Sequence, residues 1–242
     1  ILEGAAHVLK TQADPNLERK VDDIIEKIAA AQEDDGYLYT NRTINSHNPH
    51  PWAGKKRWEL VSIFSHELYN VGHLYEAAVA HFKATGKSTL LNVAIKNANL
   101  VAKEFGRGKI ESPPGHQEIE IGLVKLFGQM GEKKYLDLAK FFLEIRGDKQ
   151  RKGYHEYIER SKNQFPWKGE DRFKYNQTHA KVIEQEEAIG HAVRALYMYC
   201  AMLDVGVLTN TKEFIKIHEK LWQDVVFRKL YIIGGVGNEP IG

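Results

Sequence analysis

Three stretches of the sequence each predict a pair of antiparallel helices, and they begin at Ser65, Gly115 and Glu186. In each pair the first helix is apolar on most faces, and the second has one apolar and one polar face. Between Ala188 and Leu203, for example, Arg194 is the only formally charged residue. Helices that are apolar on most faces are buried, whereas amphipathic helices cover a core from outside. The alternation therefore predicts an inner and an outer ring of helices, as in an α/α toroid or partial solenoid.

Helical periodicity runs through most of the chain, and the alternation typical of strands is almost absent. The pattern predicts helices over residues 1–12, 16–33, 65–84, 88–104, 116–129, 132–145, 181–204 and 210–227, and allows a short extended piece at 230–233. The segments 36–58 and 147–180 are predicted to be long and irregular, and such segments often lie over a functional site. No domain boundary stands out, so we expect one all-α domain over residues 1–242.

Composition and charge narrow the classes of partner. The 34 basic and 32 acidic residues give a net charge of +2, so a nucleic-acid partner is not expected. The one cysteine, Cys200, excludes both a disulfide within the chain and a thiolate-rich zinc site. No run reaches the roughly 18 apolar residues of a membrane span, so a membrane partner is not expected either. No signal peptide is visible, which leaves the location open with the cytoplasm slightly favoured. The oligomeric state is also left open.

Each predicted helix pair carries a histidine near the start of its first helix. His66 and His73 are seven residues apart, which places them on one helix face, two turns apart. His116 follows a Pro-Pro-Gly break, and it would share a helix face with Glu120 at i, i+4. Each of these residues, taken alone, is as readily a helix cap or a hydrogen-bonded core histidine as a ligand-binding one.

The recurrence of the histidines is what favours a function. His191 would share a helix face with Glu187, four residues earlier, and it lies in an otherwise apolar helix, where an imidazole without a partner would cost free energy. Histidines at the same end of three neighbouring inner helices would converge on one mouth of a toroid. We therefore predict that His66, His116 and His191 bind a polar ligand such as a sugar.

Six motifs together resemble glycoside hydrolase family 127, whose characterised members are β-L-arabinofuranosidases. In chain order they are LEGAAHVL, DPNLERKVDDIIEKIAAAQEDDGYLYT, HELYNVGHLYEAAVAHFKATGK, GHQEIEIGLVKLF, EQEEAIGHAVRALYMYCAM and LWQDVVFRKLYIIGGVG. The resemblance runs over nearly the whole chain. It implies an (α/α)6 barrel followed by β-sandwich domains, and sugar-pocket histidines that match His66, His116 and His191.

The resemblance also implies a glutamate acid/base and a cysteine thiolate nucleophile held on zinc, in motifs after the YIIGGVG segment at 231–237. This chain has Ile233 where threonine is usual, and Cys200, inside an apolar helix, matches no family nucleophile. We therefore expect an incomplete (α/α)6 barrel in residues 1–242, without the flanking segments and β domains of the family. We assign no catalytic residue, metal ligand or cofactor to the chain, and expect zinc in the full-length family.

These expectations describe a carbohydrate-binding fragment of a glycoside hydrolase that removes arabinofuranose-type sugars from glycans. Because a retaining glycosidase needs two groups flanking the scissile bond, we expect this chain alone to hydrolyse nothing detectably. Two other interpretations stay open. One is a different α/α-toroid sugar enzyme, an epimerase or polysaccharide lyase, in which histidine is a natural acid or base. The other is a helical-repeat scaffold that binds proteins.

Overall fold

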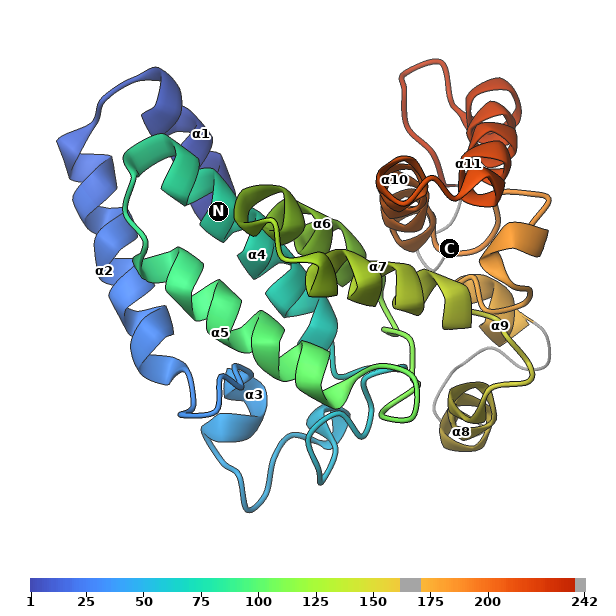
Figure 1. The fold of residues 1–242 in the computed structure, drawn as a ribbon, viewed down its shortest axis with the longest axis horizontal. Helices are drawn as coiled ribbons and strands as arrows, with labels where there is room; N and C mark the ends of the chain where they lie inside the picture. Colours follow the sequence, from blue (N-terminus) through green and yellow to red (C-terminus); the bar gives the residue numbers. More distant parts are fainter. Residues whose placement is uncertain (162–170, 238–242) are drawn as a thin grey trace.

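The computed structural model describes residues 1–161 and 171–237, and within them the fold is all-α (Figure 1). The α-helices are α1 (Leu2–Thr11), α2 (Pro15–Ala31), α3 (Thr40–Thr43), α4 (Glu67–Thr85), α5 (Thr89–Glu104), α6 (Ile119–Met130), α7 (Lys133–Ile145), α8 (Lys152–Ser161), α9 (Asp171–Tyr175), α10 (Ala192–Leu208) and α11 (Lys212–Asp224). Short 3-10 turns, η1 (Pro51–Ala53) and η2 (Val182–Glu184), and a π-helix, η3 (Val225–Lys229), complete the described elements. None of the described helices is long and apolar enough to cross a membrane.

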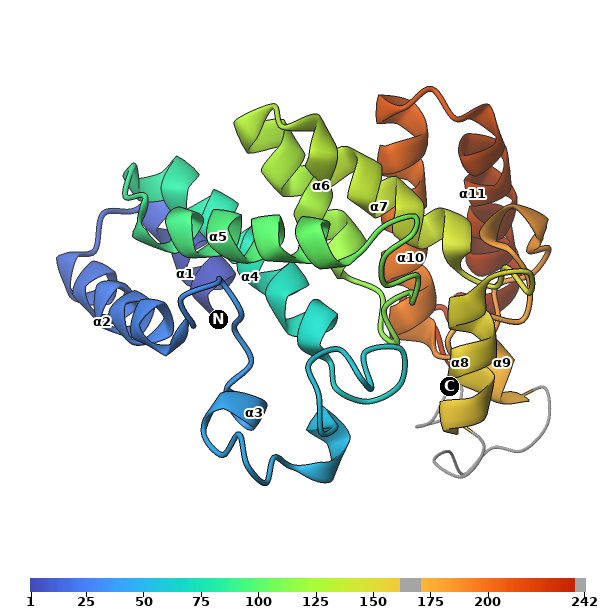
Figure 2. The same ribbon diagram turned by 60° about the horizontal axis from the view of Figure 1, so that its bottom comes forward.

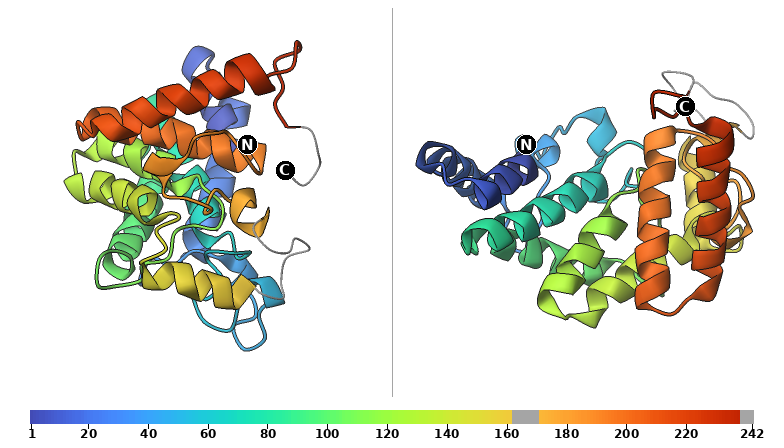
Figure 3. Two further views of the ribbon diagram at one scale, coloured as in Figure 1. Left: turned by 90° about the vertical axis from the view of Figure 1, so that its right-hand side faces the viewer. Right: turned by 90° about the horizontal axis from the view of Figure 1, so that it is seen from above.

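Successive helical hairpins lie side by side in an arc, which is the arrangement of part of an α/α toroid (Figure 3). Helix α4 packs between α1 and α6, and α6 packs in turn against α10, so these four helices form the inner layer. Helices α2, α5, α7 and α11 each pair with the inner helix that precedes them, and they form the outer layer. The predicted alternation of inner and outer helices is confirmed.

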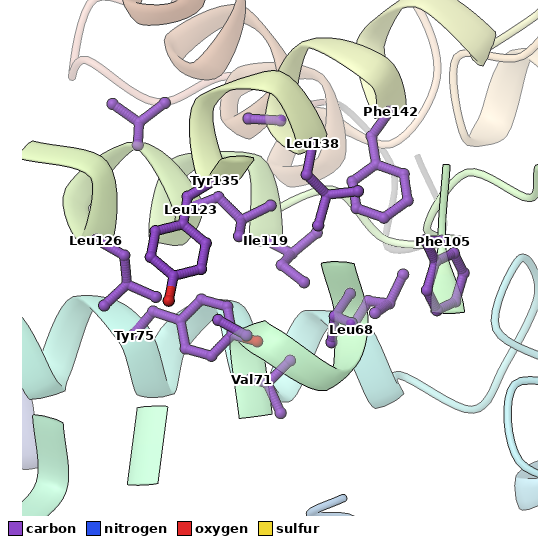
Figure 4. Close-up of a cluster of buried hydrophobic side chains, with 14 of the residues drawn as sticks. Leu68, Val71, Tyr75, Phe105, Ile119, Leu123, Leu126, Tyr135, Leu138 and Phe142 are labelled. Carbon is purple, nitrogen blue, oxygen red and sulfur yellow. The ribbon is translucent and has the colours of Figure 1, made fainter. Parts of the chain in front are cut away.

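The hydrophobic core lies between the two layers and is continuous along the arc. Figure 4 shows Tyr75 of α4 and Leu123 of α6 on either side of Tyr135 of α7. Glycine makes the closest crossing possible, because a Cβ on Gly72 would lie 2.7 Å from the backbone nitrogen of Ile119. The inner helices α4 and α6 therefore touch backbone to backbone near the start of α6.

Two of the predicted helices begin later than their periodicity suggests. Helix α6 starts at Ile119 instead of 116, and α10 starts at Ala192 instead of 181. Before α10 the backbone bonds elsewhere, since Ala188 N–H donates to Asp224 Oδ2 at 2.9 Å and His191 N–H to the Tyr175 carbonyl at 3.1 Å. The prediction of shared helix faces for the pairs His116/Glu120 and Glu187/His191 is therefore wrong.

The segment predicted as irregular over 147–180 contains the helices α8 and α9, which lie below α10 in Figure 2. Its residues 162–170 lie outside the described residues, as do the last five residues of the domain predicted over 1–242. The segment at 230–233 forms a turn instead of an extended piece, because Gly234 N–H donates to the Tyr231 carbonyl at 2.8 Å.

Candidate functional site

The three histidines singled out from the sequence lie together at one end of the inner helices. His66 is the N-cap of α4, His116 lies in the loop before α6, and His191 is the N-cap of α10. The ring centroids of His66 and His116 are 5.9 Å apart, and those of His116 and His191 are 5.8 Å apart. All three side chains are half-buried, so each keeps one side toward solvent. The geometry forms a row of imidazoles with His116 in the middle.

Local backbone contacts hold two of these rings in place. The Nδ1–H groups of His66 and His116 each donate to a backbone carbonyl, that of Phe64 at 2.6 Å and that of Gln117 at 2.8 Å. With Nδ1 protonated, a neutral ring keeps Nε2 as an acceptor. His66 also adopts the left-handed conformation, with φ 54° and ψ 17°, which turns the chain sharply into α4.

Two buried arginines fix the loops that carry the histidines. Arg146 on the C-cap of α7 donates to the carbonyl of Pro114 at 2.7 Å and to that of Asn176 at 3.0 Å. Arg194 of α10 donates to the carbonyl of Gly115, and its guanidinium lies 4.7 Å above the Tyr175 ring. The loop before α6 is thereby tied to α7, to α10 and to the segment after α9.

Burial and positive charge keep the imidazoles neutral. Burial lowers the pKa of His116 to about 3, with further contributions from Arg194 and from the other two histidines. The pKa values of His66 and His191 are lowered as well, first by burial and then by the Arg194 guanidinium. A neutral imidazole has one donor and one acceptor, which matches the two-way hydrogen bonding of a hydroxyl group. The row is therefore suited to a neutral, hydroxylated ligand.

Aromatic rings border the histidine row on the inner face of the arc. The Tyr69 ring lies 4.3 Å from that of His116 and 4.7 Å from that of His73, between centroids. Tyr197 of α10 lies 6.0 Å from His116 and 5.8 Å from His73. Tyr197 was not predicted from the sequence, although its place one turn and a half after His191 on an apolar helix was a usable signal.

A group of ionisable side chains lies beyond this aromatic border, and it was also missed from the sequence. His73 Nδ1 is 3.1 Å from Glu118 Oε1 and 3.9 Å from Glu76 Oε2. Burial and, after it, the adjacent carboxyl group of Glu76 raise the pKa of Glu118 to about 10. The signal available was the pair of His73 and Glu76 at i, i+3 on one helix face.

Two hollows of the described structure do not include the three imidazoles, although Gly190 and Ala192, on either side of His191, line the first. One of about 570 Å³ lies between the start of α10 and the segment after η3, lined by Ile189, Tyr199, Val225 and Tyr231 among others. A second, of about 680 Å³, lies between the loop at 56–59 and α8. None of the three histidines lines either hollow. The imidazoles of the histidine row therefore lie outside these two hollows.

Comparison with known proteins gives consistent relatives. The sequence-family model of the β-L-arabinofuranosidase GH127 catalytic domain matches residues 1–240 of this chain. A non-reducing end β-L-arabinofuranosidase of Bifidobacterium longum is 37% identical over 244 residues, covering 100% of this chain and 36% of that protein. The structure of a GH127 β-L-arabinofuranosidase from Geobacillus stearothermophilus T6 superposes with a TM-score of 0.89 at 41% identity, covering 100% of this chain and 37% of that one.

Another solved structure, of a GH127 β-arabinofuranosidase, is 46% identical with a TM-score of 0.87, and it covers 99% of this chain and 35% of that chain. The chain therefore spans about a third of the length of the relatives that it matches.

Proposed function

Because the chain belongs to the GH127 β-L-arabinofuranosidase family, we propose that it takes part in the removal of arabinofuranose-type sugars from glycans. Its partner in this role is a carbohydrate, bound at the wall formed by His66, His116 and His191. The observation that carries the proposal is the row of three imidazoles at 5.9 and 5.8 Å centroid spacing. We also propose that residues 1–242 are one helical domain of an α/α toroid, and that the β domains of the family lie outside this sequence.

The proposed role of the histidines is binding. With a pKa of about 3, His116 is unprotonated near neutral pH and is a poor general acid there. Its acceptor nitrogen instead orients a sugar hydroxyl, and the rings of Tyr69 and Tyr197 offer apolar surface to the sugar. A few polar groups placed in this way orient a bound sugar and make its binding specific. No catalytic role is proposed for these residues.

The zinc that the family resemblance implies does not fit the residues of this chain. A thiolate zinc site takes several cysteine ligands. The sequence contains only Cys200, which is exposed on α10. We therefore propose that a zinc thiolate belongs to those parts of the longer family members that this chain does not match.

Sugar binding can be tested by histidine-selective NMR of the purified chain titrated with methyl β-L-arabinofuranoside. We expect shifts at His66, His116 and His191, and none at His47, which is exposed in the loop after α3. His116→Ala should weaken binding by about tenfold, which corresponds to the loss of one hydrogen bond of about 1.4 kcal/mol. His47→Ala should bind as the unchanged chain does. Equal perturbation of His47, or no response from the three histidines, would contradict the proposal.

A further inference from the structure

The inner face of the arc carries a second cluster of ligand-forming side chains, separate from the histidine row. His73 and Glu76 lie one turn apart on α4, and Glu118 is the residue before α6. The tight crossing at Gly72 brings Glu118 to α4, because a Cβ on Gly72 would lie 2.9 Å from the carbonyl carbon of Glu118. Two helices thus contribute to one group.

The distances in this group match those of a small metal ion. One ligand atom from each of His73, Glu76 and Glu118 lies within 4.8 Å of the other two. His73 Nδ1 is 3.1 Å from Glu118 Oε1 and 3.9 Å from Glu76 Oε2. Two ligand atoms bound tetrahedrally to one zinc ion, each at roughly 2.0–2.1 Å, are separated by about 3.4 Å. The two observed separations lie on either side of that value.

The burial of Glu118 gives a second reason to expect a cation. The side chain of Glu118 is 0% exposed, and neither of its carboxylate oxygens has a hydrogen-bond partner among the described residues. Within the described part of the chain, no lysine or arginine forms an ion pair with Glu118 or Glu76. Buried carboxylates are ordinarily paired or bound to a metal. Glu118 therefore points into the cluster, and outside His73 and Glu76 no described residue compensates for its burial.

We propose that His73, Glu76 and Glu118 bind a zinc-type divalent cation that joins α4 to α6. One imidazole nitrogen and two carboxylates are ligands that zinc accepts, with water in the fourth position. Calcium and magnesium prefer oxygen ligands throughout. The cation would hold His73 against Tyr69 and Tyr197, whose ring centroids lie 4.7 and 5.8 Å from that of His73. It would in this way support the aromatic border of the histidine row. This site uses no cysteine, unlike the zinc thiolate implied by the family.

The test is isothermal titration of the purified, metal-free chain with zinc chloride. We expect one saturable site, binding at least about tenfold weaker in Glu118→Gln, and no comparable site for calcium. Glu132→Gln, an exposed change at the start of α7, should leave zinc binding unchanged. Far-UV circular dichroism checks that both variants are folded. Absence of zinc binding, or equal binding by Glu118→Gln and the unchanged chain, would overturn the proposal.

Two other places on the surface carry side chains that zinc accepts as ligands, and each is tested with its own variant. Cys200 is exposed on α10, the helix that packs against α6. His7 and Glu3 form an exposed pair on α1, with 3.7 Å between nitrogen and oxygen. We expect Cys200→Ser and His7→Gln to keep the site, and zinc-edge X-ray absorption to show nitrogen and oxygen neighbours without sulfur. Loss of binding in either variant, or a sulfur neighbour, would assign the zinc elsewhere.

Discussion

At the scale of single residues, Arg194 links the electrostatics of the site to its geometry. Its guanidinium bonds the Gly115 carbonyl and so holds the loop that carries His116. The same charge contributes to lowering the pKa of His66, His116 and His191. Arg194 therefore helps to hold one member of the row and also favours the neutral form of all three rings.

The lowered pKa of His116 has a consequence for stability in acid. Between pH 6.5 and about 3 the unfolded chain binds a proton at His116 that the folded chain does not, so the free energy of unfolding falls as the pH falls through this range. His116→Asn should remove this proton uptake and make the loss of stability from pH 7 to pH 4 less steep. Urea unfolding followed by circular dichroism at several pH values measures the slope. The exposed variant His47→Asn should keep the slope of the unchanged chain, and an identical slope for His116→Asn would contradict the assignment.

At the scale of helices, the crossing of α4 and α6 depends on glycine. A Cβ at Gly72 would lie 2.7 and 2.8 Å from backbone atoms of Ile119, and backbone cannot move aside as a side chain can. Gly128 lies further along α6, the helix that begins at Ile119, and a Cβ on Gly128 would meet nothing within 4 Å. The two glycines are therefore a matched pair, one required by packing and one free of it.

Alanine at these two positions should change stability in opposite directions. Gly72→Ala should lower the free energy of unfolding by about 1–3 kcal/mol or more, because the helices must separate. Gly128→Ala should raise it by about 0.5–1 kcal/mol, because alanine is the better helix former. Chemical denaturation of both variants measures the difference. Equal effects would show that the crossing is not tight.

Helix bodies were predictable from the sequence, whereas two helix starts were not. Periodicity alone located α2, α5, α7 and α11, since each has one apolar face. The residues before α6 and α10 include His116, Glu118 and Glu187, and acidic residues also suit the first turn of a helix. Their backbone groups bond to distant segments instead, as His191 N–H does with Tyr175. Periodicity carries no information about such partners.

The candidate site, too, could be predicted from the sequence only in part. Recurrence in the sequence located His66, His116 and His191, and the structure brings them together. His73 and Glu76 could be paired from their i, i+3 spacing, but the place of Glu118 beside them could not be predicted, because it arises from the backbone contact of Gly72 with α6. A tertiary crossing of that kind leaves no periodic signal in either helix.

At the scale of the whole molecule, one buried apolar cluster runs from Val21 of α2 to Val225 of η3. Residues of α4, α6 and α10 belong to it, so no hairpin has a core of its own. In a stack of repeats that share their interfaces, each unit is stabilised by its neighbours. The described hairpins are therefore expected to unfold together.

Hydrogen exchange followed by mass spectrometry in mild denaturant tests this coupling. Gly72→Ala should speed exchange of the slowest amides in α10 by the same factor as in α4, because only global unfolding exposes them. The measurement needs peptides from both helices under identical conditions. Acceleration confined to α4 and α6 would show that the hairpins open independently.

The left-handed backbone conformation of His66 lowers the stability of the folded chain. An L-residue in this conformation is less favourable by about 1–2 kcal/mol, a cost that glycine escapes. Glycine there would make the fold more robust and would at the same time delete an imidazole from the row. Under selection for heat resistance alone, glycine would be favoured at position 66, so histidine retained there in natural variants would indicate selection for the proposed sugar binding.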